Sequence, residues 1–185
     1  MKAFLREIVV TLAIAAAIVL TMLHTIQYSV VDGVSMYPSL QDQQRVVIVK
    51  VAYLFSSPQR GDIVVLQPPF QTPKPFVKRV IGIPGDSVEI RGGQVYLNGV
   101  KLTEPYINDA PAYPMRPTIV PENNYFVLGD NRNDSTDSHY GWTVVRENII
   151  GEVWLRVWPL NAWGVIQGYP LGKELQNALS AKWLE

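Results

Sequence analysis

The chain has 185 residues, of which 48% are hydrophobic, so it is long enough to form one domain around a buried core. Sixteen basic and sixteen acidic side chains cancel, which leaves no net positive charge of the kind found in nucleic-acid-binding domains. Cysteine is absent, which excludes disulfides, thiolate catalysis and cysteine-ligated metals, and two histidines are too few for a typical zinc site. We therefore expect no nucleic-acid partner, no metal and no cofactor.

The N-terminal region contains a long uncharged run, from Ile8 to Val31. As a helix with a rise of 1.5 Å per residue, this run would reach roughly 36 Å, against about 30 Å for the hydrocarbon core of a bilayer. Lys2 and Arg6 precede the run, and the positive-inside tendency places them in the cytoplasm. We predict a single-pass protein of the plasma membrane, with a cytoplasmic tail, a transmembrane anchor and an extracytoplasmic domain over residues 1–7, 8–27 and 28–185.

The pattern has two alternatives to a retained anchor, a cleavable signal peptide and a buried core helix. A cleavable signal peptide would need small residues near its end, and the run contains AIAAA. These alanines lie in the middle of the run, however, with further apolar residues after them. A buried core helix is disfavoured because no other part of the chain is helical enough to surround it.

Beyond the anchor the sequence predicts a mainly β fold. Short β-branched segments bounded by proline, glycine or aspartate recur along it. The expected strands are Arg45–Val51, Asp62–Leu66, Phe76–Gly82, Ser87–Ile90, Tyr125–Leu128 and Glu152–Trp158. The pair Asn98-Gly99, between alternating apolar residues, predicts a hairpin with a two-residue turn.

Two further segments complete the predicted architecture. The stretch from Tyr106 to Pro121 contains four prolines and is expected to be irregular, as a flap or small subdomain. A helical pattern returns only near the C-terminus, where an apolar residue recurs every fourth position. We interpret that stripe as a packing face rather than a membrane-surface helix; its members are Leu171, Leu175, Leu179 and Trp183.

Ser35 is a candidate nucleophile, in the segment VDGVSMYPSL that follows the uncharged run. Gly33 precedes it by two residues and Pro38 follows it by three, so a bent backbone could expose the hydroxyl while N–H groups face a developing oxyanion. The segment differs from the Gly-x-Ser-x-Gly elbow because Tyr37 occupies the last glycine position. Taken alone, it is also typical of a turn that leaves a membrane.

A lysine held neutral by burial could serve as the base for such a serine. In the strand Phe76–Gly82, side-chain alternation places Lys78 and Arg79 on opposite faces, so one of the two cations must point towards a buried face. Lysine can lose its proton when desolvated, whereas arginine cannot. A lysine is half neutral near pH 8 only if its pKa lies about 2.4 below the ordinary value, and this shift costs roughly 3.3 kcal/mol. Lys50 is a rival by the same reasoning, and the spacing does not choose between them.

The segment GDNRNDSTDSHYG, residues 129–141, is the densest polar cluster of the chain. It follows a predicted strand and holds donors and acceptors that could orient a lysine or a neighbouring loop. His139, with Asp137 or Asp134 nearby, offers a base for a Ser-His-Asp triad. Calcium is disfavoured because the segment lacks the glycine and the final glutamate of the familiar calcium loop. By composition alone, a solvated loop would look the same.

Together these segments resemble the bacterial type I signal peptidases, and the resemblance covers most of the chain. The family's serine box, which usually has Thr where Ser39 stands, is similar to GVSMYPSL. Its second, lysine and last boxes are similar to RGDIVVL, KRVIGIPGD and GDNRNDSTDSHYG. Four boxes in the same order behind an N-terminal anchor make the resemblance specific.

The resemblance implies a membrane-bound serine endopeptidase that removes signal peptides from exported preproteins. It would act on the outer face of the membrane, next to the lipid bilayer and close to the export translocon. Ser35 would be the nucleophile and Lys78 the general base, in a Ser-Lys dyad, and Ser135 would orient the lysine amine. The residues that match structural supports of the family's site are Asp130, Arg132 and Asp137.

Two positions depart from the family pattern. His139 stands where many members have arginine, so the triad hypothesis loses its base. Gly33 stands where some members carry a serine hydroxyl, so we expect backbone N–H groups, that of Ser35 among them, to stabilise the oxyanion. Shallow apolar pockets would admit only small side chains one and three residues before the cut; their candidate walls are Val31, Met36, Leu40, Val65, Phe76 and Val77.

The implied fold is an N-terminal transmembrane helix followed by a catalytic domain of coiled antiparallel β-sheets and a short C-terminal helix. The hairpin and a reduced second domain would occupy about residues 87–128. Two other functions stay open. One is a Ser-Lys self-cleaving regulator, which would carry a DNA-binding domain before Ser35. The other is a non-enzymatic membrane-tethered β domain in which Ser35 is only a turn residue.

Overall fold

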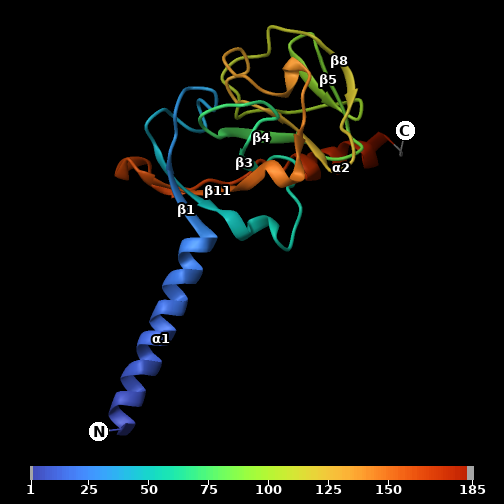
Figure 1. Cartoon of the computed structure of the whole chain (residues 1–185). Helices are drawn as coiled ribbons and strands as arrows, with labels where there is room; N and C mark the ends of the chain where they lie inside the picture. The colour runs from blue at the N-terminus through green and yellow to red at the C-terminus, as the bar shows by residue number, and fades with distance from the viewer. Residues whose placement is uncertain (1, 183–185) are drawn as a thin grey trace.

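The computed structural model describes residues 2–182, and it consists of one long helix followed by a β-rich body (Figure 1). Side chains are described for these residues except at positions 2, 3, 5, 20–24, 179, 181 and 182. Two members of the predicted C-terminal stripe, Trp183 and the side chain of Leu179, therefore lie outside the described part.

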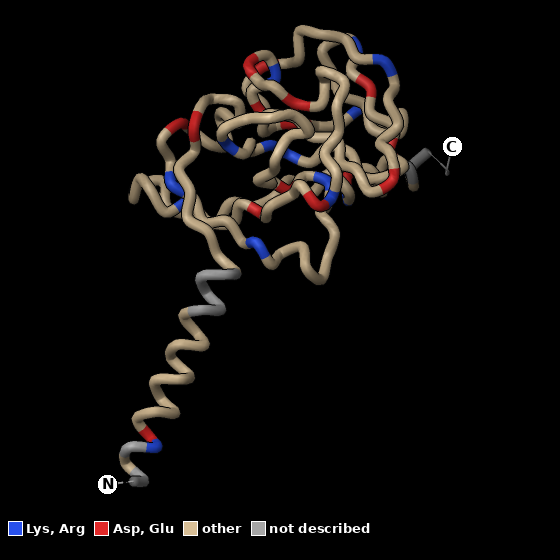
Figure 2. The backbone as a smooth tube through the Cα atoms, in the orientation of Figure 1, with Lys and Arg blue, Asp and Glu red and all other residues tan. Residues whose placement is uncertain are grey.

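Helix α1 (Lys2–Thr25) projects away from the β-rich body (Figure 1). Between Glu7 and that body, no described residue of α1 carries a charge (Figure 2). Among the described residues, no helix combines the length and the hydropathy needed to cross a membrane. The helix ends two residues before the predicted end of the anchor, because Ile26 already pairs with Val49 in the first sheet.

The larger sheet is antiparallel and has the strand order β1-β2-β11-β3-β4-β9-β10, with β12 also paired to β11. Its strands are β1 (Ile26–Val30), β2 (Arg45–Val49), β3 (Ile63–Leu66), β4 (Phe76–Gly82), β9 (Asn124–Leu128), β10 (Val144–Val145), β11 (Ile149–Trp158) and β12 (Gly164–Val165). Short 3₁₀ helices join them: η1 (Lys50–Tyr53), η2 (Ser138–Tyr140), η3 (Arg146–Asn148) and η4 (Leu160–Ala162). Shifts of register along β11 bend the sheet, as β-bulges do.

The predicted strands are found with small differences at their ends. Phe76–Gly82 coincides with β4, whereas Arg45–Val51 is too long, because β2 ends at Val49 and Lys50 begins η1. Four strands were not predicted, namely β1, β8, β10 and β12. Two of these, β10 and β12, have only two residues each, too few for an alternating pattern to be recognised.

A smaller antiparallel sheet has the order β7-β6-β5-β8, formed by β5 (Ser87–Arg91), β6 (Gln94–Leu97), β7 (Val100–Lys101) and β8 (Met115–Ile119). The predicted hairpin is confirmed: Asn98 and Gly99 have φ of 52° and 78°, and positive φ at both positions is what a type I′ turn requires. The irregular segment predicted for Tyr106–Pro121 is wrong in part, because β8 lies within it and pairs with β5.

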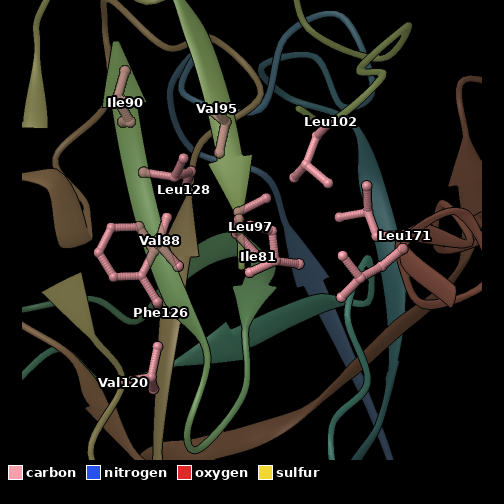
Figure 3. Close-up of a cluster of buried hydrophobic side chains, with 11 residues drawn as sticks. Ile81, Val88, Ile90, Val95, Leu97, Leu102, Val120, Phe126, Leu128 and Leu171 are labelled. Atoms are coloured by element: carbon pink, nitrogen blue, oxygen red, sulfur yellow. The ribbon is translucent and has the colours of Figure 1, made fainter. Parts of the chain in front are cut away.

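A hydrophobic core joins the two sheets (Figure 3). Its buried members come from β4 and β9 of the larger sheet, from β5 and β6 of the smaller one, and from helix α2 (Leu171–Lys182). Leu171 and Leu175 of α2 are buried in this core, which confirms the packing role of that part of the predicted stripe. Each fully buried side chain of this size contributes about 1.5–3 kcal/mol. The core thus fixes the ends of β4 and β9, from which the polar segments of the site extend.

Candidate active site

The structure brings Ser35 and Lys78 into contact, although they lie 43 residues apart. Ser35 belongs to the turn after β1, and Lys78 is the third residue of β4. The Nζ atom of Lys78 donates a hydrogen bond of 2.7 Å to the Ser35 hydroxyl. Lys78 is only 3% exposed, whereas Ser35 is half-buried and borders a cleft. The candidate nucleophile and the candidate base are therefore within hydrogen-bond distance of each other, and both line the cleft.

Burial controls the charge of the Lys78 amine. Removal from water lowers the pKa of Lys78 to about 8, although the negative charges of Asp137 and Asp130 act in the opposite direction. The ring of Phe76, on the same face of β4, lies 5.2 Å from the amine. A substantial share of Lys78 is thus neutral near pH 8, as a lysine base requires.

Arg79 is buried as well, on the opposite face of β4. Its guanidinium binds both carboxylate oxygens of Asp130, at 2.8 and 2.7 Å, and donates to the carbonyl of Gly61 at 2.8 Å. The ring of Tyr106 lies 4.0 Å from it. Both faces of this strand are therefore buried, and alternation separates an arginine kept charged by its partners from a lysine that can lose its proton.

The rival base candidates lie elsewhere. Lys50 is in η1, and the described contacts of Ser35 do not include it. His139 contacts Asp137, as a triad histidine would, but no hydrogen bond among the described residues joins it to Ser35. The Ser35 hydroxyl thus has Lys78 as its partner.

Asp137 is the centre of the polar segment 129–141 and is completely buried. One carboxylate oxygen accepts hydrogen bonds from the Gly129 N–H at 2.8 Å and from the Ser135 hydroxyl at 2.5 Å. The other accepts from the N–H of His139 at 3.2 Å, where Asp137 caps η2, and lies 2.7 Å from the His139 ring nitrogen Nδ1. Ser135, expected to orient the lysine amine, here donates to Asp137 and lines the same cleft as Lys78.

Gly129 shows how closely this segment packs on the nucleophile. A methyl group at Gly129 would lie 2.5 Å from the backbone oxygen of Ser35 and closer still to the Ser135 hydroxyl. The next contact comes from Asn131, whose N–H donates to that same Ser35 oxygen at 3.0 Å. Neither Gly129 nor Asn131 was predicted as a site residue; the glycine directly after a buried strand was the available signal.

The predicted supports Asp130 and Arg132 hold the segment from behind. Asp130 pairs with Arg79, and Arg132 pairs through two hydrogen bonds, of 3.0 and 2.6 Å, with Glu104. Arg132 also donates to the carbonyl of Gly129 at 2.9 Å, although its side chain is completely buried. Glu104 was missed in the sequence, because nothing in its neighbours marks it as a partner for a residue 28 positions away.

The backbone at Ser35 offers a donor for an oxyanion. Gly33 has φ of +96°, a left-handed conformation that favours glycine, and its N–H donates to Asp42 at 2.8 Å. Among the described residues, the Ser35 N–H donates to no acceptor. The N–H of the nucleophile is therefore available, whereas that of Gly33 is engaged.

A cleft of about 560 Å³ runs beside the Ser35–Lys78 contact. Residues 29–36 form one wall, residues 74–78 a second, and residues 133–136 with Tyr140 a third. Of the six predicted pocket residues, four line this cleft, namely Val31, Met36, Phe76 and Val77. Leu40 and Val65 do not line it; both are buried in the hydrophobic cluster that also contains Val31 and Met36.

Comparison with known proteins shows the family to which the chain belongs. The family model described as signal peptidase, peptidase S26, matches residues 1–158. The chain is 45% identical over 137 residues to signal peptidase I of Leptolyngbya laminosa, an alignment that covers 70% of this chain and 68% of that protein. It is 41% identical over 167 residues to the probable signal peptidase I-2 of Synechocystis sp., covering 88% of this chain and 76% of that protein.

A crystal structure of a signal peptidase I from Enterococcus faecalis is similar with a TM-score of 0.48 and 35% identity, and covers 53% of this chain and 97% of that one. The family model extends over far more than half of the 185 residues, and both relatives exceed 40% identity over most of this chain. The chain therefore belongs to the signal peptidase family and is a serine peptidase.

Proposed function

We propose that this peptidase removes N-terminal signal peptides from exported preproteins, with Ser35 as nucleophile and Lys78 as general base. The observation that carries the proposal is the 2.7 Å contact between the Ser35 hydroxyl and the amine of a buried lysine. The names of the relatives, signal peptidases, support the substrate class. A non-enzymatic tethered domain is wrong for a member of a peptidase family.

In the proposed reaction, neutral Lys78 accepts the Ser35 proton while the serine oxygen attacks the carbonyl carbon before the cut. The negative oxygen of the tetrahedral intermediate accepts a hydrogen bond from the free N–H of Ser35. As the C–N bond breaks, the Lys78 ammonium gives its proton to the leaving amine, which leaves an ester on Ser35. Lys78 then takes a proton from water, which attacks the ester carbon. As the ester C–O bond breaks, Lys78 returns that proton to the Ser35 oxygen, and the signal peptide is released with a free carboxylate.

The apolar walls of the cleft provide a basis for the choice of small residues. Val31, Met36, Phe76 and Val77 line the cleft, and Val31 and Met36 belong to the same buried cluster as Leu40 and Val65, which do not line it. Because that cluster is already packed, a pocket between the walls is shallow. A bulky side chain before the cut would clash with the packed cluster, and such steric rejection discriminates between substrates.

We further infer that α1 anchors the peptidase in the lipid bilayer, with Lys2 and Arg6 on the cytoplasmic side and the cleft outside. The uncharged run and the exposed apolar side chains of α1 support this arrangement. Exposed aromatic and aliphatic residues near β11 and η4 would touch the bilayer surface; they include Trp154, Trp158, Leu160 and Trp163. The cleft would then lie at the membrane surface, close to where exported chains leave the translocon.

Replacing either member of the dyad should abolish cleavage. Ser35→Ala removes the nucleophile, and Lys78→Met keeps an apolar chain of similar length without the amine, so kcat/KM for a preprotein should fall about 10³-fold or more. Gel analysis of the released signal peptide in detergent micelles measures this. Lys50→Met, which alters the rival lysine, should cleave like wild type. Wild-type rates in either dyad variant would disprove the assignment.

Activity should rise with pH around a midpoint near 8. The pKa of Lys78 is lowered to about 8, and only the neutral amine accepts the serine proton, so each pH unit below the midpoint should reduce kcat/KM about tenfold. Rates for one preprotein measured from pH 6 to 9.5 test this. A profile that is flat across this range would contradict a lysine base.

Gly129→Ala should reduce activity sharply, because the added methyl group forces apart the Ser35 carbonyl and Ser135. A displacement of the nucleophile by about 1 Å can cost about 10²-fold in rate. The measurement is kcat/KM, with circular dichroism to confirm folding. Gly172→Ala is the matched control, since no atom lies within 4 Å of a methyl group there. Equal activity of the two variants would show that the tight contact is unimportant.

Charged residues in α1 should release the protein from membranes. Leu12→Arg combined with Ile14→Arg places two cations among exposed apolar side chains, at about 2.5–3.5 kcal/mol each near the centre of a spanning helix. Flotation with phospholipid vesicles should recover the wild type in the lipid fraction and lose most of the variant. Ile119→Arg, on the exposed strand β8, should float like wild type. Full flotation of the double variant would contradict the anchor.

A further inference from the structure

His139 packs against the buried carboxylate that supports the dyad. Its Nδ1 atom lies 2.7 Å from Asp137, and its side chain is only 12% exposed. Two aromatic rings pack on the imidazole, the stacked ring of Tyr113 and the tilted ring of Tyr140, each with its centroid 4.0 Å away. The ring is therefore fixed in place against Asp137 and has little contact with water.

The negative charge of Asp137 influences the pKa of the Lys78 amine. Asp137 is the largest of the influences that raise the pKa of Lys78, against the lowering caused by burial. Its other oxygen receives the hydrogen bonds of Ser135 and Gly129, so the carboxylate is also tied to the nucleophile's surroundings. Any group that compensates this negative charge makes the amine easier to deprotonate.

The groups that face His139 come from two segments. Asp137 and Tyr140 belong to the η2 turn, and Tyr113 belongs to the segment before β8. Two further charged residues influence the Tyr113 hydroxyl electrostatically, Arg132 and Glu104. They form an ion pair with each other. Asp137 is thus the charged partner in direct contact with the imidazole, a group that ordinarily gains or loses its proton between pH 5 and 8.

We propose that His139 is a positioning residue for the Ser35–Lys78 pair and acts through Asp137. A charged imidazole compensates the Asp137 carboxylate, whereas a neutral imidazole leaves its full negative charge facing the catalytic amine. The inference rests on the proposed role of Lys78 as the general base. His139 would thus help to set the pH range of the reaction without contacting Ser35 directly.

The sign of the effect follows from the charges. At low pH, the charged imidazole makes Lys78 release its proton more readily. Activity therefore extends to lower pH than it would with a neutral residue at position 139. With a neutral group at position 139, Lys78 holds its own proton more tightly.

Two substitutions separate the states of His139. Arginine is permanently charged and its planar group also stacks on aromatic rings, so His139→Arg fits between the tyrosines. It should move the rising limb of kcat/KM to lower pH and increase kcat/KM about threefold at pH 7.5. For His139→Gln, kcat/KM should equal the wild-type value above pH 8.5. At pH 6 it should be about threefold lower than the wild-type value.

A merely structural role would change both variants by a similar factor at every pH, and that result would overturn the inference. Glu89→Gln is the matched control, because it also adds one positive unit of charge but lies on β5 in the smaller sheet. The control should leave the midpoint where it is in wild type. A shift of the same size in the control would also overturn the inference.

Nuclear magnetic resonance provides a readout that does not depend on activity. The sequence contains two histidines, so His24→Gln identifies the resonances of His139. Coupling between sites is reciprocal, so removal of the positive charge in Lys78→Met should raise the midpoint of the His139 titration by about half a pH unit. An unmoved titration together with an unmoved rising limb would refute the role of His139. The proposed function would still stand if Lys78→Met and Ser35→Ala are inactive.

Discussion

The burial of one lysine amine beside a serine hydroxyl is the constraint on which the rest of this structure depends. A pKa lowered from 10.5 to about 8 corresponds to about 3 kcal/mol that folding must offset whenever Lys78 is charged. Between pH 8 and 10.5 the unfolded chain binds more protons at this residue than the folded one, so stability rises with pH across that window. Below pH 8 the full cost is present. The buried Lys78 is therefore a destabilising element, and its surroundings must be rigid enough to retain it.

That rigidity comes from arginine–carboxylate pairs arranged around β4. Arg79 with Asp130 and Arg132 with Glu104 satisfy each other's hydrogen bonds in the interior, and Arg132 also reaches the Gly129 carbonyl. Removing one partner from such a pair would leave a buried charge alone, which costs about 3–5 kcal/mol. The pairs thus fix the backbone of the segment 129–141, and this segment in turn holds the Ser35 carbonyl through Asn131.

Sequence patterns predicted most of the strands and singled out both Ser35 and Lys78, which the structure brings into contact, but by different routes. A short β-branched run bounded by proline and glycine identified β4, and alternation along it placed Lys78 and Arg79 on opposite faces. The same rule could not choose between Lys78 and Lys50, since each cation sits among apolar neighbours; the choice came from the resemblance of four boxes. Glu104 and Asn131 were missed because their partners are distant in sequence and only the tertiary fold unites them. Strand β8 was missed because Pro117 within it and the prolines on either side concealed a segment that pairs on one edge only.

The path of the chain also gives a physical reason for the location of the cleft. Ser35 follows the last residue of α1 by ten positions, so even a fully extended segment places the nucleophile within about 36 Å of the helix end. Residues 29–35 of this segment are themselves a wall of the cleft. A preprotein of the proposed kind has the same plan, an apolar helix followed by an extended stretch that carries the bond to be cut. Enzyme and substrate would therefore leave the bilayer side by side, and the depth of the cut would be set by where the two helices end.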